Sequence, residues 1–247
     1  METLLNHKTI RKYTEQSIDE SLLNQILEAG CRASTTGNMQ VYSVVVSRSD
    51  EMKEKLAPCH FNQPMVKQAP VMLTFCADFN RFNKWCERRN AVPGYDNFLS
   101  FVTAAIDALL VAQNVCIAAE SKGLGICYLG TTTYMAKNII EILKLPKGVV
   151  PVTTVTLGWP DEDPDQIDRL PLDGIIHYET YKDYSAEDID RIYAEKEARE
   201  DNMQFIAEND KESLAQVFTD VRYKKADNVT FSGMLLEVLK EQGFMNQ

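Results

Sequence analysis

The sequence is poor in the residues that mark several common classes of protein. Glycine accounts for only 11 of the 247 residues, and no stretch rich in proline, glycine and serine divides the chain. This composition excludes fibrous and disordered classes, while a hydrophobic content of 45% is enough to form a sizeable core. We therefore expect one globular domain with a C-terminal extension.

Positive charge is also scarce. The net charge is −10, with 26 lysines and arginines against 36 aspartates and glutamates. A surface that binds nucleic acid or an anionic membrane needs clustered cations, so we expect neither as a partner. The N-terminus lacks the apolar run of a secretory signal, and the six cysteines have no paired spacing, which together favour a reducing cytoplasm.

Familiar catalytic motifs are missing as well. The three histidines, His7, His60 and His177, stand at no ligand spacing from one another, so no metal site is predicted. The chain also lacks a nucleophile elbow, a Walker-type glycine loop and a GxGxxG fingerprint. The usual dinucleotide-binding fold is therefore disfavoured, and any ligand is held in some other way.

A long apolar segment dominates the middle of the chain. Between residues 98 and 119 apolar side chains fall on every face of a helical wheel, which predicts a helix that forms a core or a subunit interface. Its polar interruptions make a membrane span unfavourable, because each would be costly in hydrocarbon. Lys122 and Gly123 predict the end of this helix, and residues 126–129 predict a buried strand.

Capping signals and short apolar runs predict the other elements. Ser17 and Glu20 form a capping box that starts a helix ending near Gly30. Strands are predicted at 41–46, 69–77 and 149–157, and helices at 50–56, 134–143, 186–199 and 231–242. The tail after Asp161 is acidic and has too little apolar surface for a core of its own, so we expect it to wrap this subunit or a partner.

Two polar segments could bind a ligand. His7, Lys8, Arg11 and Lys12 lie within six positions just before the first long helix. Arginine and lysine near backbone amides are the usual way to hold a phosphate monoester, but charge alone favours a solvated basic start. Residues 34–40 are either plain turn chemistry or a set of short donors for a polar ligand, and the residues themselves leave both interpretations open.

Several segments become specific when they are taken together. The opening HKTIRKY is similar to an R-S-I-R-x-[FY] motif, and residues 34–40 are similar to a Ser/Thr-rich loop that ends N-x-Q. FCADFNR at 75–81, AAESKGLG at 118–125, and LGWP at 157–160 with RLP at 169–171 match more closely. In order, from residue 5 to about residue 182, the pattern resembles the nitroreductase family of flavoproteins, and within it the oxygen-insensitive nitroreductase A and flavin reductase P subfamily.

The resemblance implies an α+β fold with a central antiparallel sheet flanked by helices. It also implies a homodimer, with the long central helix at an intimate interface and a C-terminal extension that wraps the partner. Residues 1–182 would form the FMN-binding core and residues 183–247 a helical extension on the core or the partner subunit. FMN would then lie at the interface, so the dimer would be part of the active site.

The resemblance further implies where FMN binds. The N-terminal segment and Arg169 would hold the phosphate and ribityl chain, Gln63 would lie near the isoalloxazine, and the strand end at 128–131 would present its backbone to the ring. No residue is expected to be catalytic, because FMN carries the chemistry. The implied cofactor-binding residues are His7, Lys8, Thr9, Arg11, Ser34, Thr35, Thr36, Asn38, Gln40, Gln63, Tyr128, Leu129, Gly130, Thr131 and Arg169.

The implied activity is ping-pong oxidoreduction. NADPH or NADH would give hydride to flavin N5 and leave, and a small-molecule acceptor (a nitroaromatic, a quinone or free flavin) would take the electrons at the same place. An alternative is a flavin carrier or redox sensor on the same scaffold, which either nicotinamide would reduce only slowly. A structural dimer without a cofactor would require every motif to be a coincidence.

The sequence departs from the subfamily at two places. Residues 167–169 read Ile-Asp-Arg where the subfamily has Lys-Pro-Arg, so one phosphate-binding cation is missing and an acid is nearby. Either FMN binds more weakly or Lys8 compensates. Residues 202–225 lack the paired-arginine loop thought to grip the 2′-phosphate of NADPH, which leaves the choice between NADPH and NADH open. The candidate substitutes for that loop are Arg222, Lys224 and Lys225.

Overall fold

The computed structural model describes residues 1–246, and Gln247, the last residue of the predicted extension, lies outside the described residues. The chain divides into two compact units. The first combines Met1–Asp165 with Phe231–Gln247, and the second is Gln166–Thr230. The division between residues 182 and 183 stays a prediction.

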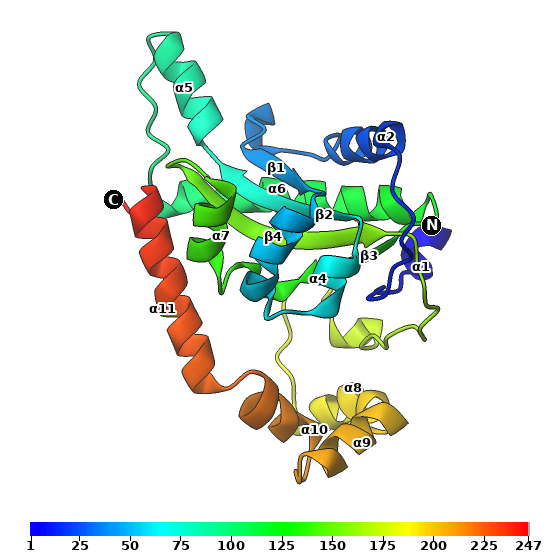
Figure 1. The fold of residues 1–247 in the computed structure, drawn as a ribbon. Coiled ribbons are helices and arrows are strands. Elements are labelled where there is room, and N and C mark those ends of the chain that lie inside the picture. Colours follow the sequence, from blue (N-terminus) through cyan, green and yellow to red (C-terminus); the bar gives the residue numbers. More distant parts are fainter. Residues whose placement is uncertain (247) are drawn as a thin grey trace. The chain divides into compact units, whose positions relative to one another are not determined.

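The first unit is built on a four-stranded sheet in the order β1-β2-β4-β3 (Figure 1). Every neighbouring pair of strands is antiparallel. The predicted strands are confirmed, with ends shifted by at most two residues. The observed strands are β1 Tyr42–Ser47, β2 Val71–Asp78, β3 Gly125–Leu129 and β4 Val149–Gly158. The central strands β2 and β4 are buried almost throughout, as continuous apolar runs predict.

Helix α6, Phe98–Glu120, runs along the sheet and packs against helix α2, Glu20–Gly30 (Figure 1). Gly30 is required at this contact, because a Cβ atom there would lie 2.2 Å from Cγ2 of Val115. By length and composition alone α6 could cross a membrane, yet one of its faces is part of the core between α2 and the sheet. The core residues from these elements include Ile26, Leu73, Phe75, Val111, Val115 and Leu157.

The start of α2 corrects the predicted capping box. Asp19, not Ser17, is the N-cap, and its carboxylate accepts hydrogen bonds from the amides of Ser21 and Leu22 at 2.8 and 3.4 Å. Serine and aspartate are about equally good N-caps, but a carboxylate also gains from the positive end of the helix dipole. The predicted end near Gly30 is confirmed.

Short helices complete the first unit. The helix predicted at 50–56 is confirmed as α3, Asp50–Leu56, and the one predicted at 134–143 as α7, Ala136–Leu143. Three further helices were not predicted: α1 Glu2–Leu5, α4 Pro64–Gln68 and α5 Asn80–Arg88. Short 3-10 turns cover Thr36–Asn38, Ala57–His60 and Gly130–Thr132, all within or beside predicted ligand loops.

The second unit consists of short helices. Helix α8, Ala186–Glu197, begins at a capping box in which Ser185 and Asp188 bond to each other's amides. Ile192, Leu214 and Val217 are buried, and Ile192 contacts the backbone position of Gly174. The helices are α8 Ala186–Glu197, α9 Glu200–Glu208 and α10 Leu214–Gln216, followed by a π-helix at Val217–Arg222.

The last helix, α11 Lys225–Gln242, begins in the second unit and ends in the first. Val238, Leu239 and Phe244 are buried in a cluster with Phe79 and Val150. The end of the predicted extension therefore packs on its own subunit, which was one of the two alternatives for the tail.

Candidate functional site

The predicted phosphate-binding segment runs beside β3. Thr9 forms a parallel bridge with Ile126, and the Ile10 amide donates to the Ile126 carbonyl at 2.9 Å. Gly125 permits this approach, because a Cβ atom there would lie 2.6 Å from side-chain atoms of Ile10. The structure therefore brings the cationic segment next to the strand that ends at the predicted flavin-facing residues.

Two of the predicted cofactor ligands on this segment already have acidic neighbours. Nδ1 of His7 lies 2.6 Å from the carboxylate of Glu120, which is largely buried. Nζ of Lys8 lies 2.7 Å from the carboxylate of Asp163, whose side chain is 89% exposed. An exposed ion pair contributes little free energy, so Lys8 can exchange Asp163 for a ligand phosphate at small cost.

Arg11 lies at an anion-accepting part of the backbone. The amides of Arg11 and Lys12 both donate to Oε1 of Glu162, at 2.5 and 3.0 Å. Two adjacent amides that converge on one oxygen form the kind of concavity that favours negative charge. In the described part of the chain no carboxylate lies within 4.0 Å of the Arg11 guanidinium, so that cation is available to a phosphate.

A buried carboxylate accepts hydrogen bonds from the backbone of the Ser/Thr-rich loop. Asp107 of α6 is fully buried and accepts hydrogen bonds from the amides of Thr36 and Val41 at 2.9 and 3.3 Å. Asn38 and Gln40 both have positive φ angles, 56° and 54°, which a non-glycine residue adopts only when its surroundings impose them. Asp107 therefore stabilises a strained loop, and the loop leaves Ser34 and Thr36 exposed to a ligand.

Arg81 also donates hydrogen bonds to the backbone at the end of this loop. Its Nη2 donates to the carbonyls of Gln40 and Tyr42, the latter at 3.1 Å, and its Nη1 donates to the Ser43 hydroxyl at 3.3 Å. A groove of about 610 Å³ lies here, lined by residues that include Cys31, Gln40 and Arg81. Gln40 is the one predicted cofactor-binding residue that lines it, so the groove is not the predicted flavin site.

Gln63 and the end of β3 meet at His60. Nδ1 of His60 lies 2.9 Å from the Thr131 hydroxyl. The backbone amide and the side-chain Nε2 of Gln63 both donate to the His60 carbonyl at 3.1 Å. His60 is fully buried, and burial lowers its pKa to about 4, so the ring is neutral at pH 7.

The end of β3 offers space as well as donors. A Cβ atom built on Gly130 would meet no heavy atom within 4 Å. Leu129 is buried in the core, so only its backbone can face a ligand, whereas Tyr128 is partly exposed and its hydroxyl donates to Gln113 at 3.3 Å. FMN carries a phosphate and several ring acceptors, and the guanidinium, amides and hydroxyls found here fit that chemistry.

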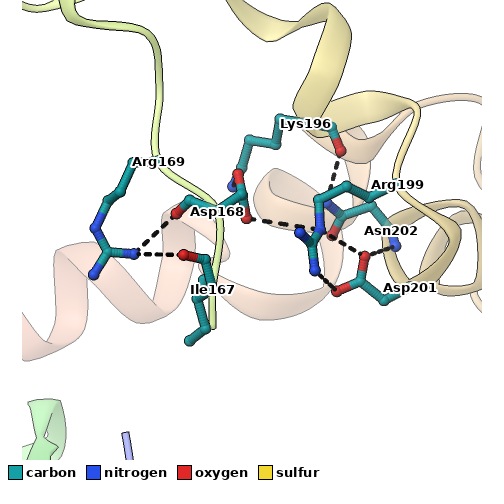
Figure 2. Close-up of polar contacts among 7 residues, drawn as sticks. All are labelled: Ile167, Asp168, Arg169, Lys196, Arg199, Asp201 and Asn202. Atoms are coloured by element: carbon teal, nitrogen blue, oxygen red, sulfur yellow. Dashed lines mark hydrogen bonds and ion pairs between the residues drawn. The ribbon is translucent and has the colours of Figure 1, made fainter. Parts of the chain in front are cut away.

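Arg169 belongs to the second unit. Its Nη1 donates to the carbonyls of Ile167 and Asp168 at 3.2 and 2.9 Å (Figure 2). The Asp168 carboxylate instead lies 2.9 Å from Nζ of Lys196 and 3.9 Å from Nε of Arg199 (Figure 2). The acid that departs from the subfamily pattern is thus neutralised within its own unit, and the Arg169 guanidinium keeps its charge for a ligand.

Sequence reasoning missed two residues that organise the site. Asp107 is one of the polar interruptions of the apolar segment at 98–119, and the sequence singles out His60 only as a possible metal ligand. The available signal for Asp107 was an acid inside an otherwise apolar helix, while no sequence signal identifies His60. Among residues 1–246 no group of three histidine, cysteine or acidic side chains could hold a metal ion.

The family of the chain follows from its match to a family profile. The profile described as the nitroreductase family matches residues 4–159, well over half of the sequence. The chain belongs to the nitroreductase family. The resemblance found in the sequence is thereby confirmed, and so is the nitroreductase-like α+β fold with its antiparallel sheet flanked by helices.

Individual proteins are similar over most of the chain. A Bacillus subtilis (strain 168) protein named FMN reductase (NADPH) is 34% identical over 183 residues, which cover 73% of this chain and 74% of that protein. An oxygen-insensitive NADPH nitroreductase of Salmonella typhimurium is 33% identical over 182 residues, 74% of each chain. The crystal structure of a Bacteroides fragilis NCTC 9343 protein is similar over 100% of both chains, with a TM-score of 0.98 and 62% identity.

Proposed function

We propose that this member of the nitroreductase family is an FMN-dependent oxidoreductase. It takes electrons from NADPH or NADH and passes them to nitroaromatics, quinones or free flavin. The observation that carries the proposal is the pairing of residues 9 and 10 with Ile126, which sets a cationic segment beside β3, the strand that ends at the open space around Gly130. The names of two relatives, FMN reductase (NADPH) and oxygen-insensitive NADPH nitroreductase, support the donor and the acceptor classes.

The chain's own residues bind and orient the cofactor. Lys8 and Arg11 neutralise the phosphate. The role of Arg169, which belongs to the second unit, stays a prediction from the resemblance. The side-chain Nε2 of Gln63 donates to His60, which leaves the amide oxygen of Gln63 to accept from a ring N–H. When FMN is bound it supplies the two-electron chemistry. The other proposed contacts are His7, Thr9, Ser34, Thr35, Thr36, Asn38, Gln40, Tyr128, Leu129, Gly130 and Thr131.

We also propose that the protein is a homodimer formed through α6. This helix exposes Leu99, Ile106, Leu109 and Leu110, with Leu99 at 74% exposure. A row of large apolar side chains on the surface is a typical protein–protein interface. In the dimer, part of the loop at 34–40 would complete the partner's FMN site. The proposal extends to a cytoplasmic location, an FMN-binding core at residues 1–182 and a helical extension at 183–247.

The proposed activity is tested by an absorbance spectrum of the purified protein, followed by anaerobic addition of NADH and, separately, NADPH. Flavin bands that bleach within seconds support the reductase and rank the two donors. A bound flavin that stays oxidised refutes the reductase and favours a carrier. A colourless protein that does not take up added FMN refutes the cofactor.

Light scattering after gel filtration tests the dimer. Leu109→Glu places a charge on the exposed apolar face of α6, so we expect a mass of one chain for this variant and of two for the wild type. Substitution of an exposed residue outside α6, Val92→Glu, is the control. A wild-type mass of one chain refutes the dimer.

A further inference from the structure

His60 is a fully buried histidine with one nitrogen that is not used. Its Nε2 has no hydrogen-bond partner among the described residues, although its Nδ1 contacts Thr131. A buried polar atom without a partner costs folding free energy, and an apolar side chain of similar volume would avoid that cost. Stability alone therefore does not account for a histidine at this position, and exceptions of this kind concentrate at functional sites.

The ring and the backbone of His60 join two loops that are far apart in the sequence. Nδ1 contacts the hydroxyl of Thr131, 71 residues away. The carbonyl receives both donors of Gln63, its backbone amide and its side-chain Nε2. Thr131 is fixed in turn, because its carbonyl accepts from the amides of Tyr134 and Met135 at 3.1 Å. One residue thus couples the positions of two proposed ring contacts.

The loop between His60 and Gln63 is strained. Phe61 and Asn62 both have a φ angle of 54°, so two consecutive non-glycine residues adopt the left-handed conformation. Each such residue costs folding free energy and persists only when its surroundings over-determine it. The amides of Phe61 and Asn62 donate to the carbonyls of Pro58 and Ala57, and the His60 carbonyl closes the turn onto Gln63. The orientation of Gln63 therefore depends on where His60 is held.

We propose that His60 is a positioning residue for the flavin ring. It locks the loop of Gln63 to the end of β3 through Thr131, and in this way sets the affinity for FMN. The inference rests on the proposed FMN site, and it assigns His60 no contact with the cofactor and no proton transfer. A leucine at position 60 would remove both the nitrogen without a partner and the contact with the Thr131 hydroxyl.

The test compares FMN affinity with stability. FMN-loaded wild type and variants are diluted, and the dissociation constant is obtained from the fluorescence of released FMN. Urea unfolding of the same samples after FMN removal gives the stability. For His60→Leu we expect an FMN dissociation constant about tenfold higher, as for the loss of about one positioning hydrogen bond, with a urea midpoint equal to or above that of the wild type. His60→Asn, which keeps a polar group near Nδ1, should recover most of the affinity.

A double-mutant cycle with Thr131→Val separates positioning from direct contact. If His60 acts through Thr131, His60→Leu adds little to the loss caused by Thr131→Val. The matched control is Thr132→Val, since the buried Thr132 hydroxyl donates to the Leu129 carbonyl at 2.9 Å and its bond does not involve His60. This control should lower the urea midpoint, and His60→Leu should weaken FMN binding in it as much as in the wild type.

Three results would overturn the inference. The first is an unchanged FMN dissociation constant in His60→Leu. The second is a weaker FMN affinity that is matched by an equally large loss of stability, which indicates a structural role only. The third is full additivity with Thr131→Val. A wild type that retains no FMN refutes the proposed function itself and is distinguished by its own spectrum.

Discussion

Acidification should destabilise the protein through His60 in a way that one substitution removes. The pKa of His60 is lowered by burial from 6.5 to about 4 in the folded chain. Between these values the unfolded chain binds a proton that the folded chain does not, so the free energy of unfolding decreases as the pH falls from about 6.5 towards 4. The stability that comes from keeping His60 neutral is fully present above pH 6.5 and is lost progressively as the pH falls towards 4.

The size of this effect follows from the two pKa values. A difference between 6.5 and about 4 corresponds to about 3 kcal/mol when titration is complete. Between pH 7 and pH 4.5 the unfolded histidine is almost fully protonated and the folded one only in part. We therefore expect the wild type to lose about 2 kcal/mol more than His60→Asn over this interval.

Urea unfolding at pH 7, 6, 5 and 4.5 measures the difference. Both proteins are used without FMN and at one concentration, so that cofactor and subunit binding do not enter the comparison. Carboxylates titrate in both proteins and cancel when the variant is subtracted. Parallel stability curves for the two proteins would refute the buried neutral histidine.

Further substitutions test other parts of the site. Gly125→Ala should displace the N-terminal segment, because the new Cβ would lie 2.6 Å from the Ile10 side chain, and should therefore lower both the FMN affinity and the stability. Gly130→Ala should weaken FMN binding and leave the urea midpoint unchanged, because its Cβ would meet no protein atom within 4 Å. Equal effects of the two substitutions on the urea midpoint would contradict this prediction. Asp163→Asn should free its lysine partner and tighten FMN binding about twofold to threefold at low salt, as measured by fluorescence titration; Asp165→Asn, which removes an exposed acid that pairs with no described cation, should have no such effect. Asp107→Asn replaces one of the two accepting carboxylate oxygens with an NH2 donor, so one loop amide loses its acceptor, and we expect a loss of about 2 kcal/mol in urea unfolding and a lower FMN content. A variant with normal FMN content would refute the role of Asp107 in the loop.

The strands could be predicted because buried strands consist of continuous apolar runs that are visible in the sequence. The runs at β2 and β4 leave no polar face, and their ends were predicted to within two residues. Helix α5 was missed because it is mostly polar and is fixed by aromatic contacts such as that of Phe82 with Tyr95, with ring centroids 5.4 Å apart. Periodicity does not report contacts of that kind. The wrong N-cap of α2 has a similar cause, since two good capping residues compete within three positions.

The candidate site could be predicted as a set of segments but not as an arrangement. The N-terminal segment was identified by its charges, yet its place beside β3 depends on a glycine at 125 that only the folded backbone explains. His60 and Asp107 act through hydrogen bonds to residues 71 positions away or to backbone amides. A side chain whose role is to hold another residue has no motif of its own. Such residues become visible only when burial and partners are known.

The position of the last helix has a consequence for the order in which the protein can fold during synthesis. The core of the first unit includes Val238, Leu239 and Phe244, which follow the whole of the second unit along the chain. The ribosome synthesises the sheet and α6 before it synthesises these residues. The core of the first unit therefore cannot be completed, and the apolar surface around Phe79 stays uncovered, until the second unit has been synthesised. Chaperones that bind nascent chains have their natural target in that interval, and a stop codon anywhere before α11 would leave the surface permanently exposed.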